Sequence, residues 1–218
     1  MGRRWASGVV GALGNPTLEL HDSTGALLQS NDDWRTDQEQ EIIAAHLGPA
    51  NDLESAIVAD LAPGSYTAIV SGVGGGTGIA LVEIYDLEPS NGKLANISTR
   101  ARVDVGDDVM IGGFIINGPQ SQKNVIRALG PSLAAQGVTG ALANPVLDLY
   151  NSNGDLLIEN DDYYTRRVYG VIGGYGLVPG SLYEPAIYFE GAPGSFTAIV
   201  SGLDGTAGVG LIEIYDVD

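Results

Sequence analysis

Part of this sequence occurs twice, and the duplication constrains the fold more than any other feature of the chain. Residues 64–72 (GSYTAIVSG) return as residues 194–202 (GSFTAIVSG), and residues 81–86 (LVEIYD) return as residues 211–216 (LIEIYD). Because a repeat of this kind corresponds to one structural unit, the two copies should adopt the same fold. Chemistry that belongs to the unit should also occur in both copies.

The correspondence extends to the residues before these segments. Residues 11–16 match residues 140–145, and the triplet Asn-Asp-Asp at 31–33 matches the same triplet at 160–162. The spacing then changes by one residue between about positions 34 and 47. The copies diverge most in this loop.

The segment between the copies has no counterpart upstream. Copy one spans about residues 8–87 and copy two about residues 137–218. Three runs between them predict strands, at residues 94–103, 109–117 and 124–129. If a complete module needs these strands, residues 1–88 are a truncated module and residues 89–218 a complete one. A truncated sandwich exposes unpaired backbone groups, so we expect either a piece of a longer array or a gap that another chain fills.

The composition favours an all-β protein. The 32 glycines, the 10 prolines and the lack of long helical periodicity indicate short strands joined by tight turns. In each copy an alternating run, a turn at residues 22–25 or 151–154 and a second run predict a β-hairpin. Further strands are expected at residues 56–59, 65–71, 79–85, 186–189, 195–201 and 209–215. We predict two tandem antiparallel β-sandwiches of jelly-roll-like form, the first without its opening strands.

The charge of the chain excludes some classes of partner. A net charge of −17, from 27 acidic and 10 basic residues, argues against nucleic acid and membrane insertion. The acidity favours hard cations, although it also serves solubility alone. There is no cysteine, so disulfides and thiolate metal sites are excluded. No apolar run follows the basic residues near the start, so we expect any export signal to lie outside this chain.

The repeated acidic triplet is the leading candidate for a binding site. Its members are Asn31, Asp32 and Asp33 in copy one and Asn160, Asp161 and Asp162 in copy two. With backbone carbonyls and a distant carboxylate they offer the roughly six to eight oxygens that Ca²⁺ prefers. The distant carboxylate is expected to be Glu54 in copy one and Glu184 in copy two. The alternative is that these side chains only cap turns through hydrogen bonds to the backbone.

The loop after the triplet differs between the copies. In copy one, Thr36 and Glu39 have the spacing of a capping box, which predicts one or two helical turns. In copy two, the candidate ligand-binding residues are Tyr163, Tyr164, Arg166, Arg167, Tyr169 and Tyr175. Tyrosine and arginine are favoured at recognition surfaces, so a glycan or a surface protein is a candidate partner. The alternative is that the tyrosines pack on their own sandwich.

The motifs follow one another in a distinctive order. Residues 18–33 have the pattern L-x-L-x-D-x-x-G-x-L-L-x-x-N-D-D, followed by A-P-G-S-Y-T at residues 62–67 and a glycine-rich turn. This order resembles the bacterial pre-peptidase C-terminal domains, which implies secreted β-sandwich modules, several with calcium in the turn that corresponds to the triplet. The longer pattern, with residues 94–100, 112–114 and 127–132, is similar to a tandem repeat of large exported proteins of verrucomicrobial and related bacteria. The resemblance implies an extracellular or cell-surface location and an architecture more than an activity.

Catalytic motifs find little support in the sequence. His21 and His46 correspond to Tyr150 and Gly176, so the copies share no histidine base. No nucleophile elbow, zinc-protease helix or kinase motif occurs. The glycine-rich run at residues 72–78 lacks the lysine of a phosphate loop and predicts a hairpin turn. A glycosidase pair of carboxylates stays open as an alternative, because pairs in space are invisible in sequence.

We therefore expect a non-catalytic extracellular repeat protein for adhesion, display or spacing in a surface assembly, stabilised by calcium. Its expected partners are neighbouring repeats or copies of itself. One alternative is a self-assembling, filament-like subunit that is completed by strand donation between chains. Another is a carbohydrate-binding accessory module of a secreted hydrolase.

Overall fold

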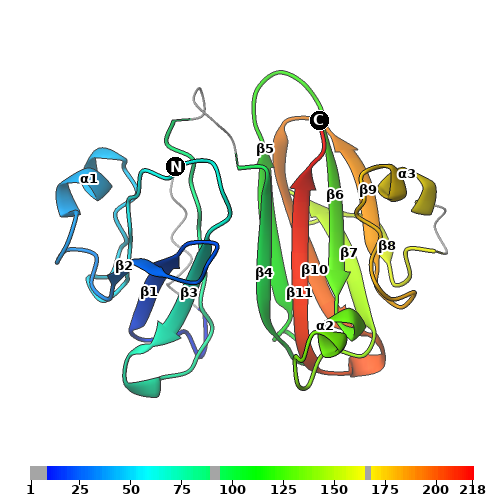
Figure 1. Cartoon of the computed structure of the whole chain (residues 1–218), viewed down its shortest axis with the longest axis horizontal. Coiled ribbons are helices and arrows are strands. Elements are labelled where there is room, and N and C mark those ends of the chain that lie inside the picture. The colour runs from blue at the N-terminus through cyan, green and yellow to red at the C-terminus, as the bar shows by residue number, and fades with distance from the viewer. Residues whose placement is uncertain (1–8, 89–93, 165–167) are drawn as a thin grey trace. The chain divides into compact units, whose positions relative to one another are not determined.

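The structure is a computed structural model that describes residues 9–88, 94–164 and 168–218. The described residues form eleven strands in three antiparallel sheets, together with three short α-helices (Figure 1). This arrangement confirms the predicted all-β fold. The chain divides into Met1–Lys93, here called unit 1, and Leu94–Asp218, here called unit 2.

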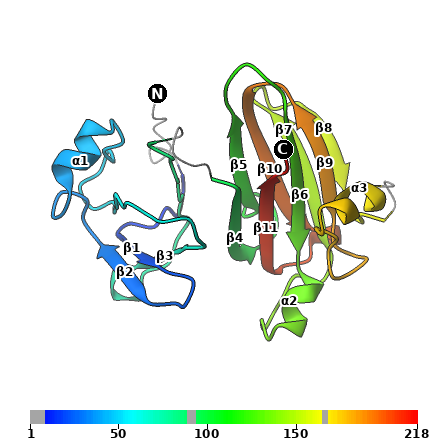
Figure 2. The ribbon, with the colours of Figure 1, turned by 45° about the horizontal axis from the view of Figure 1, so that its top comes forward.

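Unit 2 is a complete sandwich of two four-stranded sheets. Their strand orders are β5-β10-β7-β8 and β4-β11-β6-β9. The strands are β4 (Asn96–Val103), β5 (Met110–Ile116), β6 (Gln122–Leu129), β7 (Pro145–Asn151), β8 (Leu156–Asn160), β9 (Ala186–Gly191), β10 (Gly194–Gly202) and β11 (Gly208–Asp216). The helix α3 (Tyr169–Gly174) lies beside β8 and β9, and α2 (Pro131–Ala135) lies at one end of the sandwich (Figure 2). The three strands predicted between the copies are confirmed as β4, β5 and β6.

The core of unit 2 lies between its two sheets. Successive residues of a strand point to opposite faces, so Leu147 and Leu149 of β7 point inward together. Both are fully buried, and Ile212 of β11 in the opposite sheet is 2% exposed. The rings of Phe189 and Phe196 add an edge-on contact with centroids 4.9 Å apart. Each such buried side chain stabilises the fold by about 1.5–3 kcal/mol.

Unit 1 contains one sheet, with the strand order β2-β1-β3. Its elements are β1 (Pro16–His21), β2 (Leu27–Asn31), α1 (Glu39–Ala44), β3 (Thr67–Gly72) and the 3₁₀ turn η1 (Val73–Gly75). By the duplication, β1, β2 and β3 correspond to β7, β8 and β10. The register agrees as well, because Leu18 pairs with Asn31 and Val70, as Leu147 pairs with Asn160 and Val200.

The predicted hairpins are present in both copies. Asp22 Oδ1 accepts the N–H of Thr24 at 2.8 Å, and Asn151 Oδ1 accepts the N–H two residues on at 2.9 Å. Gly25 and Gly154 close these turns with φ of 85° and 84°. Only glycine adopts this region readily, which explains its place in both turns.

Two strands predicted for copy one do not form. Residues 56–59 and 79–85 contain no strand, whereas their counterparts in copy two are β9 and β11. Both β9 and β11 pair with β6. The described part of unit 1 has no equivalent of β6, so these segments lack the partner that a ladder requires.

The glycine-rich turn was predicted wrongly as a hairpin. In unit 2 it passes through η2 (Leu203–Gly205) and joins β10 to β11, which belong to different sheets. A Cβ on Gly208 would lie 2.6 Å from the backbone nitrogen of Leu142, and one on Gly78 would lie 2.6 Å from that of Leu13. The glycines therefore allow the close backbone approach at which the chain crosses between layers.

The predicted capping box is also wrong, although the helix in copy one exists. The N-cap of α1 is Gln38, with φ of 55° and no capping side chain. Thr36 instead donates its hydroxyl to the carbonyl of Asp33 at 2.7 Å. Copy two has a helix at the same place, α3, which the sequence did not indicate.

Candidate functional site

The repeated triplet, residues 31–33 in copy one and 160–162 in copy two, is here called the acidic corner. It is built around one buried asparagine in each copy. Asn31 Oδ1 accepts the N–H of Ala56 at 3.1 Å, and Asn31 Nδ2 donates to the carbonyl of Asp33 at 3.1 Å. Asn160 makes the same two bonds in copy two, at 3.0 and 3.1 Å. The two side chains are 6% and 2% exposed. The amide thus ties the end of a strand to the segment that follows the loop, and its oxygen and nitrogen are both occupied.

The aspartates of the corner differ in their surroundings. Asp32 and Asp161 are exposed, and Asp33 and Asp162 are half-buried. Burial, together with the neighbouring charge of Asp161, raises the pKa of Asp162. Asp33 Oδ1 is buried without a hydrogen-bond partner among the described residues, which is a feature that a cation would satisfy. No group of three or more His, Cys, Asp and Glu side chains converges within the described ranges, so calcium stays a prediction.

Glu184 is held by a different part of the sandwich from the one expected. Its carboxylate accepts the N–H of Gly130 at 2.9 Å, the N–H and hydroxyl of Ser132 at 2.8 and 2.6 Å, and the N–H of Ser181 at 3.0 Å. The side chain is 0% exposed. Only its backbone reaches the corner, where its carbonyl accepts the N–H of Tyr163 at 3.3 Å. Glu184 therefore joins the segment just before β9 to the turn after β6 through charge-assisted hydrogen bonds.

Glu54 repeats the backbone part of this arrangement but only one of the carboxylate contacts. Its carbonyl accepts the N–H of Trp34 at 2.9 Å. Within the described residues its carboxylate receives only the N–H of Asn51, at 3.4 Å. Three of the four donors to Glu184 come from the turn after β6, which the described part of unit 1 does not contain. Glu54 thus has the position of Glu184 but few of its partners.

Tyr163, a candidate ligand-binding residue, does not lie on a recognition surface and instead follows the alternative that the tyrosines pack on their own sandwich. It is 5% exposed and packs in a second core cluster with Val125, Ile172 and Ala186. Its ring also stacks on Tyr169, with centroids 6.1 Å apart. The counterpart of Tyr163 in copy one, Trp34, is 3% exposed. A large aromatic ring under the corner is therefore part of the repeat's core.

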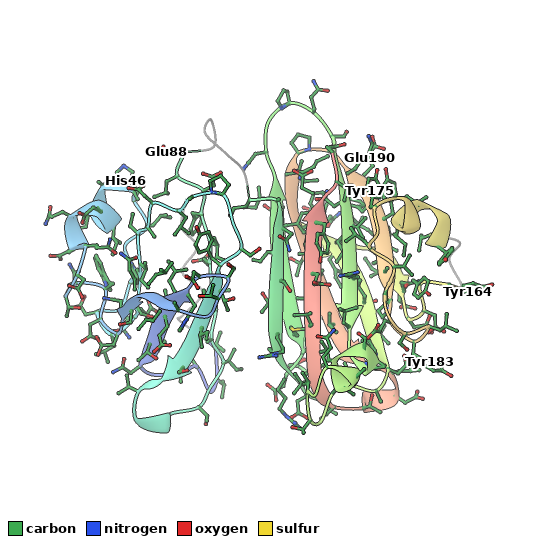
Figure 3. All side chains as sticks on the ribbon, in the orientation of Figure 1. His46, Glu88, Tyr164, Tyr175, Tyr183 and Glu190 are labelled. Atoms are coloured by element: carbon green, nitrogen blue, oxygen red, sulfur yellow. The ribbon has the colours of Figure 1, made fainter. Side chains whose placement is uncertain are left out.

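The remaining residues of the predicted recognition loop are on the surface or outside the description. Tyr164, Tyr169 and Tyr175 are 67%, 52% and 43% exposed. Figure 3 shows Tyr164 directed away from unit 2. Arg166 and Arg167 lie outside the described residues. The structure therefore leaves three accessible tyrosines around α3.

Arg127 of β6 and Glu213 and Tyr215 of β11 form a polar cluster that was not predicted from the sequence. Arg127 Nε donates to Glu213 Oε2 at 2.5 Å, and another guanidinium N–H donates to the hydroxyl of Tyr215 at 3.2 Å. The Tyr215 hydroxyl in turn donates to Glu213 Oε1 at 2.8 Å. Burial acts to lower the pKa of Arg127, but the bond and charge of Glu213 raise it above the usual value. The signal was present in the sequence, because Glu and Tyr recur in both copies of LxEIYD.

The described part of unit 1 contains the acidic half of this cluster. The Tyr85 hydroxyl donates to Glu83 Oε1 at 3.0 Å, as Tyr215 does to Glu213. Within the described residues, no arginine or lysine forms an ion pair with Glu83. Glu83 and Tyr85 therefore keep the mutual contact of Glu213 and Tyr215.

The apolar residues beside Glu83 are exposed. Val82 is 40% and Ile84 50% exposed, whereas their counterparts Ile212 and Ile214 are 2% and 5% exposed. Only Asn31, Trp34 and Ile42 are buried in the described part of unit 1. The difference between the copies follows from the missing strands, because the side chains themselves are nearly the same.

The two histidines occupy unrelated positions in unit 1. His21 Nε2 lies 3.0 Å from Glu19 Oε2, and its Nδ1 lies 3.1 Å from the carbonyl of Gly25. The hydrogen bond to Glu19 and then that to Gly25 raise the pKa of His21, because both favour the doubly protonated ring. His46 follows α1 with φ of 60°. In the described residues neither histidine forms a hydrogen bond with a serine or threonine side chain.

Comparisons with known proteins give matches among solved structures alone. No family model and no curated protein matches the sequence. Among solved structures, the chain is similar to the pre-peptidase C-terminal domain of a collagenase from Bacillus anthracis. The likeness has 11% sequence identity and a TM-score of 0.35, and it covers 55% of this chain and 89% of that chain. The strand order itself places unit 2 in the class of antiparallel β-sandwich modules.

No helix in the described ranges has the length and the apolar character needed to span a bilayer.

Proposed function

We propose that this chain is a non-catalytic, extracellular β-sandwich repeat protein for adhesion, display or spacing in a surface assembly. The observation that carries the proposal is the pairing of one closed module with one open module of the same repeat. Unit 2 buries apolar side chains such as Ile212 and Ile214 of β11 between its two sheets. Unit 1 exposes the residues at the matching positions, Val82 and Ile84. An exposed edge of this kind is a site for joining another chain.

Two measurements on the full chain test the proposal: whether it joins assemblies and whether it turns over a substrate. Light scattering and electron microscopy over a wide range of protein concentration, with and without other surface components, measure whether the chain joins assemblies. Incubation with a broad panel of polysaccharides and peptides measures turnover. Assembly without turnover is expected. Reproducible hydrolysis that survives repurification would overturn the non-catalytic role.

The open edge also favours a second function, that of a self-assembling subunit completed by strand donation. In that case the chain supplies its own partner, and its mass in solution should rise with protein concentration. Substituting Ile84→Lys should abolish this rise, because a lysine in place of a 50% exposed isoleucine blocks an apolar contact. A mass that stays that of a monomer at all concentrations contradicts self-assembly while leaving other partners open.

The exposed tyrosines favour a third function, that of a carbohydrate-binding accessory module. Tyr164 is 67% exposed and presents a ring on which a sugar could stack. A glycan array with Tyr164→Ala tests this role. Tyr183→Ala is the matched control, because Tyr183 is 60% exposed on a different loop (Figure 3). Binding that is lost only with Tyr164→Ala supports the role, and an array without binding rejects it.

A further inference from the structure

We infer that Asn117 is a site of spontaneous covalent modification, at which deamidation converts the side-chain amide to a carboxylate. The site is an Asn-Gly pair in the loop between β5 and β6, which arches at one end of unit 2 (Figure 1). The inference is independent of the proposed function, because it concerns the reactivity of the chain itself.

The chain contains three Asn-Gly pairs, at residues 91–92, 117–118 and 153–154. The first pair lies outside the described residues. The other two share their exposure and the conformation of their glycine. Asn117 and Asn153 are both exposed, and Gly118 and Gly154 have φ of 85° and 84°. They therefore form a matched pair within one sandwich, in which the main difference is hydrogen bonding.

Deamidation of an Asn-Gly pair begins when the backbone nitrogen of the glycine attacks the side-chain carbonyl carbon of the asparagine. A new C–N bond forms, the bond from that carbon to the amide nitrogen breaks, and ammonia leaves with the proton of the glycine nitrogen. The product is a succinimide ring. Water then adds to one of its two carbonyl carbons and opens the ring to aspartate or isoaspartate. Glycine favours the attack, because it has no Cβ to restrict the backbone conformation.

The reacting groups at Asn117 are not held by other parts of the fold. Within the described residues, neither the side-chain amide of Asn117 nor the N–H of Gly118 takes part in a hydrogen bond. A Cβ added to Gly118 would meet nothing within 4 Å apart from its chain neighbours. The peptide between the two residues can therefore turn toward the side-chain carbonyl without losing a contact.

The same groups at Asn153 are held by the hairpin turn between β7 and β8. The carbonyl of Asn151 accepts the N–H of Gly154, the attacking group, at 3.1 Å. The Oδ1 of Asn151 accepts the N–H of Asn153 at 2.9 Å and that of Asp155 at 3.0 Å. The glycine nitrogen must give up its bond, and the turn must open, before attack is possible. Asn153 should therefore deamidate more slowly than Asn117 in the folded chain.

The modification changes both the charge and the backbone directly after β5. Either product adds one negative charge to a chain whose net charge is −17. Isoaspartate also routes the main chain through the former side-chain carbon, so the path from β5 to β6 becomes longer. The change begins beside Ile116, which is 2% exposed and pairs with Gly194 at the end of the ladder between β5 and β10. Older molecules should therefore be more acidic and altered at this end of unit 2.

The test follows both sites in one sample of the full chain. Folded protein is incubated in mildly alkaline buffer and digested at intervals, and mass spectrometry coupled to liquid chromatography measures the asparagine, aspartate and isoaspartate forms of each peptide. Asn117 should be converted at roughly ten or more times the rate of Asn153, because at least two hydrogen bonds must open at Asn153 and each contributes about two- to tenfold. In denaturant the two rates should agree within about threefold, since the fold no longer separates the sites.

Two variants connect the rates to the structure. Asn151→Ala removes both Oδ1 bonds of the turn and should raise the rate at Asn153 toward that at Asn117. Circular dichroism checks that this variant folds, and the comparison in the unchanged chain decides the inference if it does not. Asn117→Gln should remove the first acidic species seen on ion exchange, because glutamine would have to form a larger ring.

Two results overturn the inference. One is equal rates at Asn117 and Asn153 in the folded chain. The other is an Asn117 that stays unconverted in the folded chain while it reacts in denaturant. Both results leave the proposed function standing, which fails instead on turnover.

Discussion

Asp148 of β7 lies directly opposite Glu159 of β8, so two carboxylates face each other across the outer surface of unit 2. Like charges in directly opposed cross-strand positions destabilise a sheet. Burial, and after it the charge of Glu159, raises the pKa of Asp148 above its usual value. The folded state therefore holds the Asp148 proton more tightly than the unfolded chain does. This contribution to stability is present at low pH and is lost as the pH rises through the raised pKa.

The first prediction concerns Asp148→Asn. At neutral pH the substitution should stabilise unit 2 by a few tenths to about 1 kcal/mol, because it removes one of two opposed charges. The gain should shrink as the pH falls below the ordinary aspartate range, where Asp148 is protonated in both states. Urea unfolding at a series of pH values measures it. Asp107→Asn, at an exposed position, is the control and should show no gain. A pH-independent effect would contradict the explanation.

The second prediction concerns the asparagine of the corner. Asn160→Ala leaves the N–H of Ala186 and the carbonyl of Asp162 without the bonds they have now. We expect a loss of about 2–3 kcal/mol in the free energy of unfolding, since buried polar groups then lack partners. Asn153→Ala, in an exposed turn, should change stability by less than about 0.5 kcal/mol. Equal effects of the two substitutions would show that the corner is not structural.

The third prediction contrasts the two equivalent glutamates. Glu184→Gln weakens a buried set of charge-assisted hydrogen bonds and should cost about 1.5–3 kcal/mol. Glu54→Gln in the isolated chain should cost less than about 0.5 kcal/mol, because its carboxylate has one weak contact in the described chain. Thermal melting followed by circular dichroism measures both. A large loss with Glu54→Gln would mean that its site is already occupied.

The fourth prediction concerns calcium. If the triplets bind Ca²⁺, an excess of about 100 times Kd should stabilise the folded chain by about 2.7 kcal/mol, and a chelator should reverse this. Melting curves with calcium, with magnesium and with chelator measure the effect. The double substitution of Asp32→Ala and Asp161→Ala should abolish it. An identical melting temperature in all three conditions would show that the corner is held by its asparagines alone.

The hairpins and the strands of unit 2 could be predicted because their causes are local. Alternating residues, an Asp or Asn that accepts turn N–H groups, and a glycine with positive φ are all read from the sequence. The strands at 56–59 and 79–85 could not be judged in this way. Their residues match those of β9 and β11, and only the presence of a pairing partner separates the two outcomes.

The candidate site shows the same division. The recurrence of Asn31 at 160 pointed to the corner, but its hydrogen bonds to the next segment depend on residues more than twenty positions away. The sequence left open whether Tyr163 contacts a ligand or packs on its own sandwich, and only the tertiary structure places it in the core. Arg127 went unnoticed since nothing near it in sequence marks it as the partner of Glu213.

The sequence by itself determined that the chain contains one repeat twice and that the repeat is made of strands. These follow from side-chain periodicity and turn residues, which act over a few positions. The tertiary structure alone decided which carboxylates are buried with partners and which stay exposed. Hydrogen bonding and burial depend on strands that are distant in the chain, so Glu213 is paired with Arg127, whereas Glu83 has only the Tyr85 hydroxyl as a side-chain partner in the described residues.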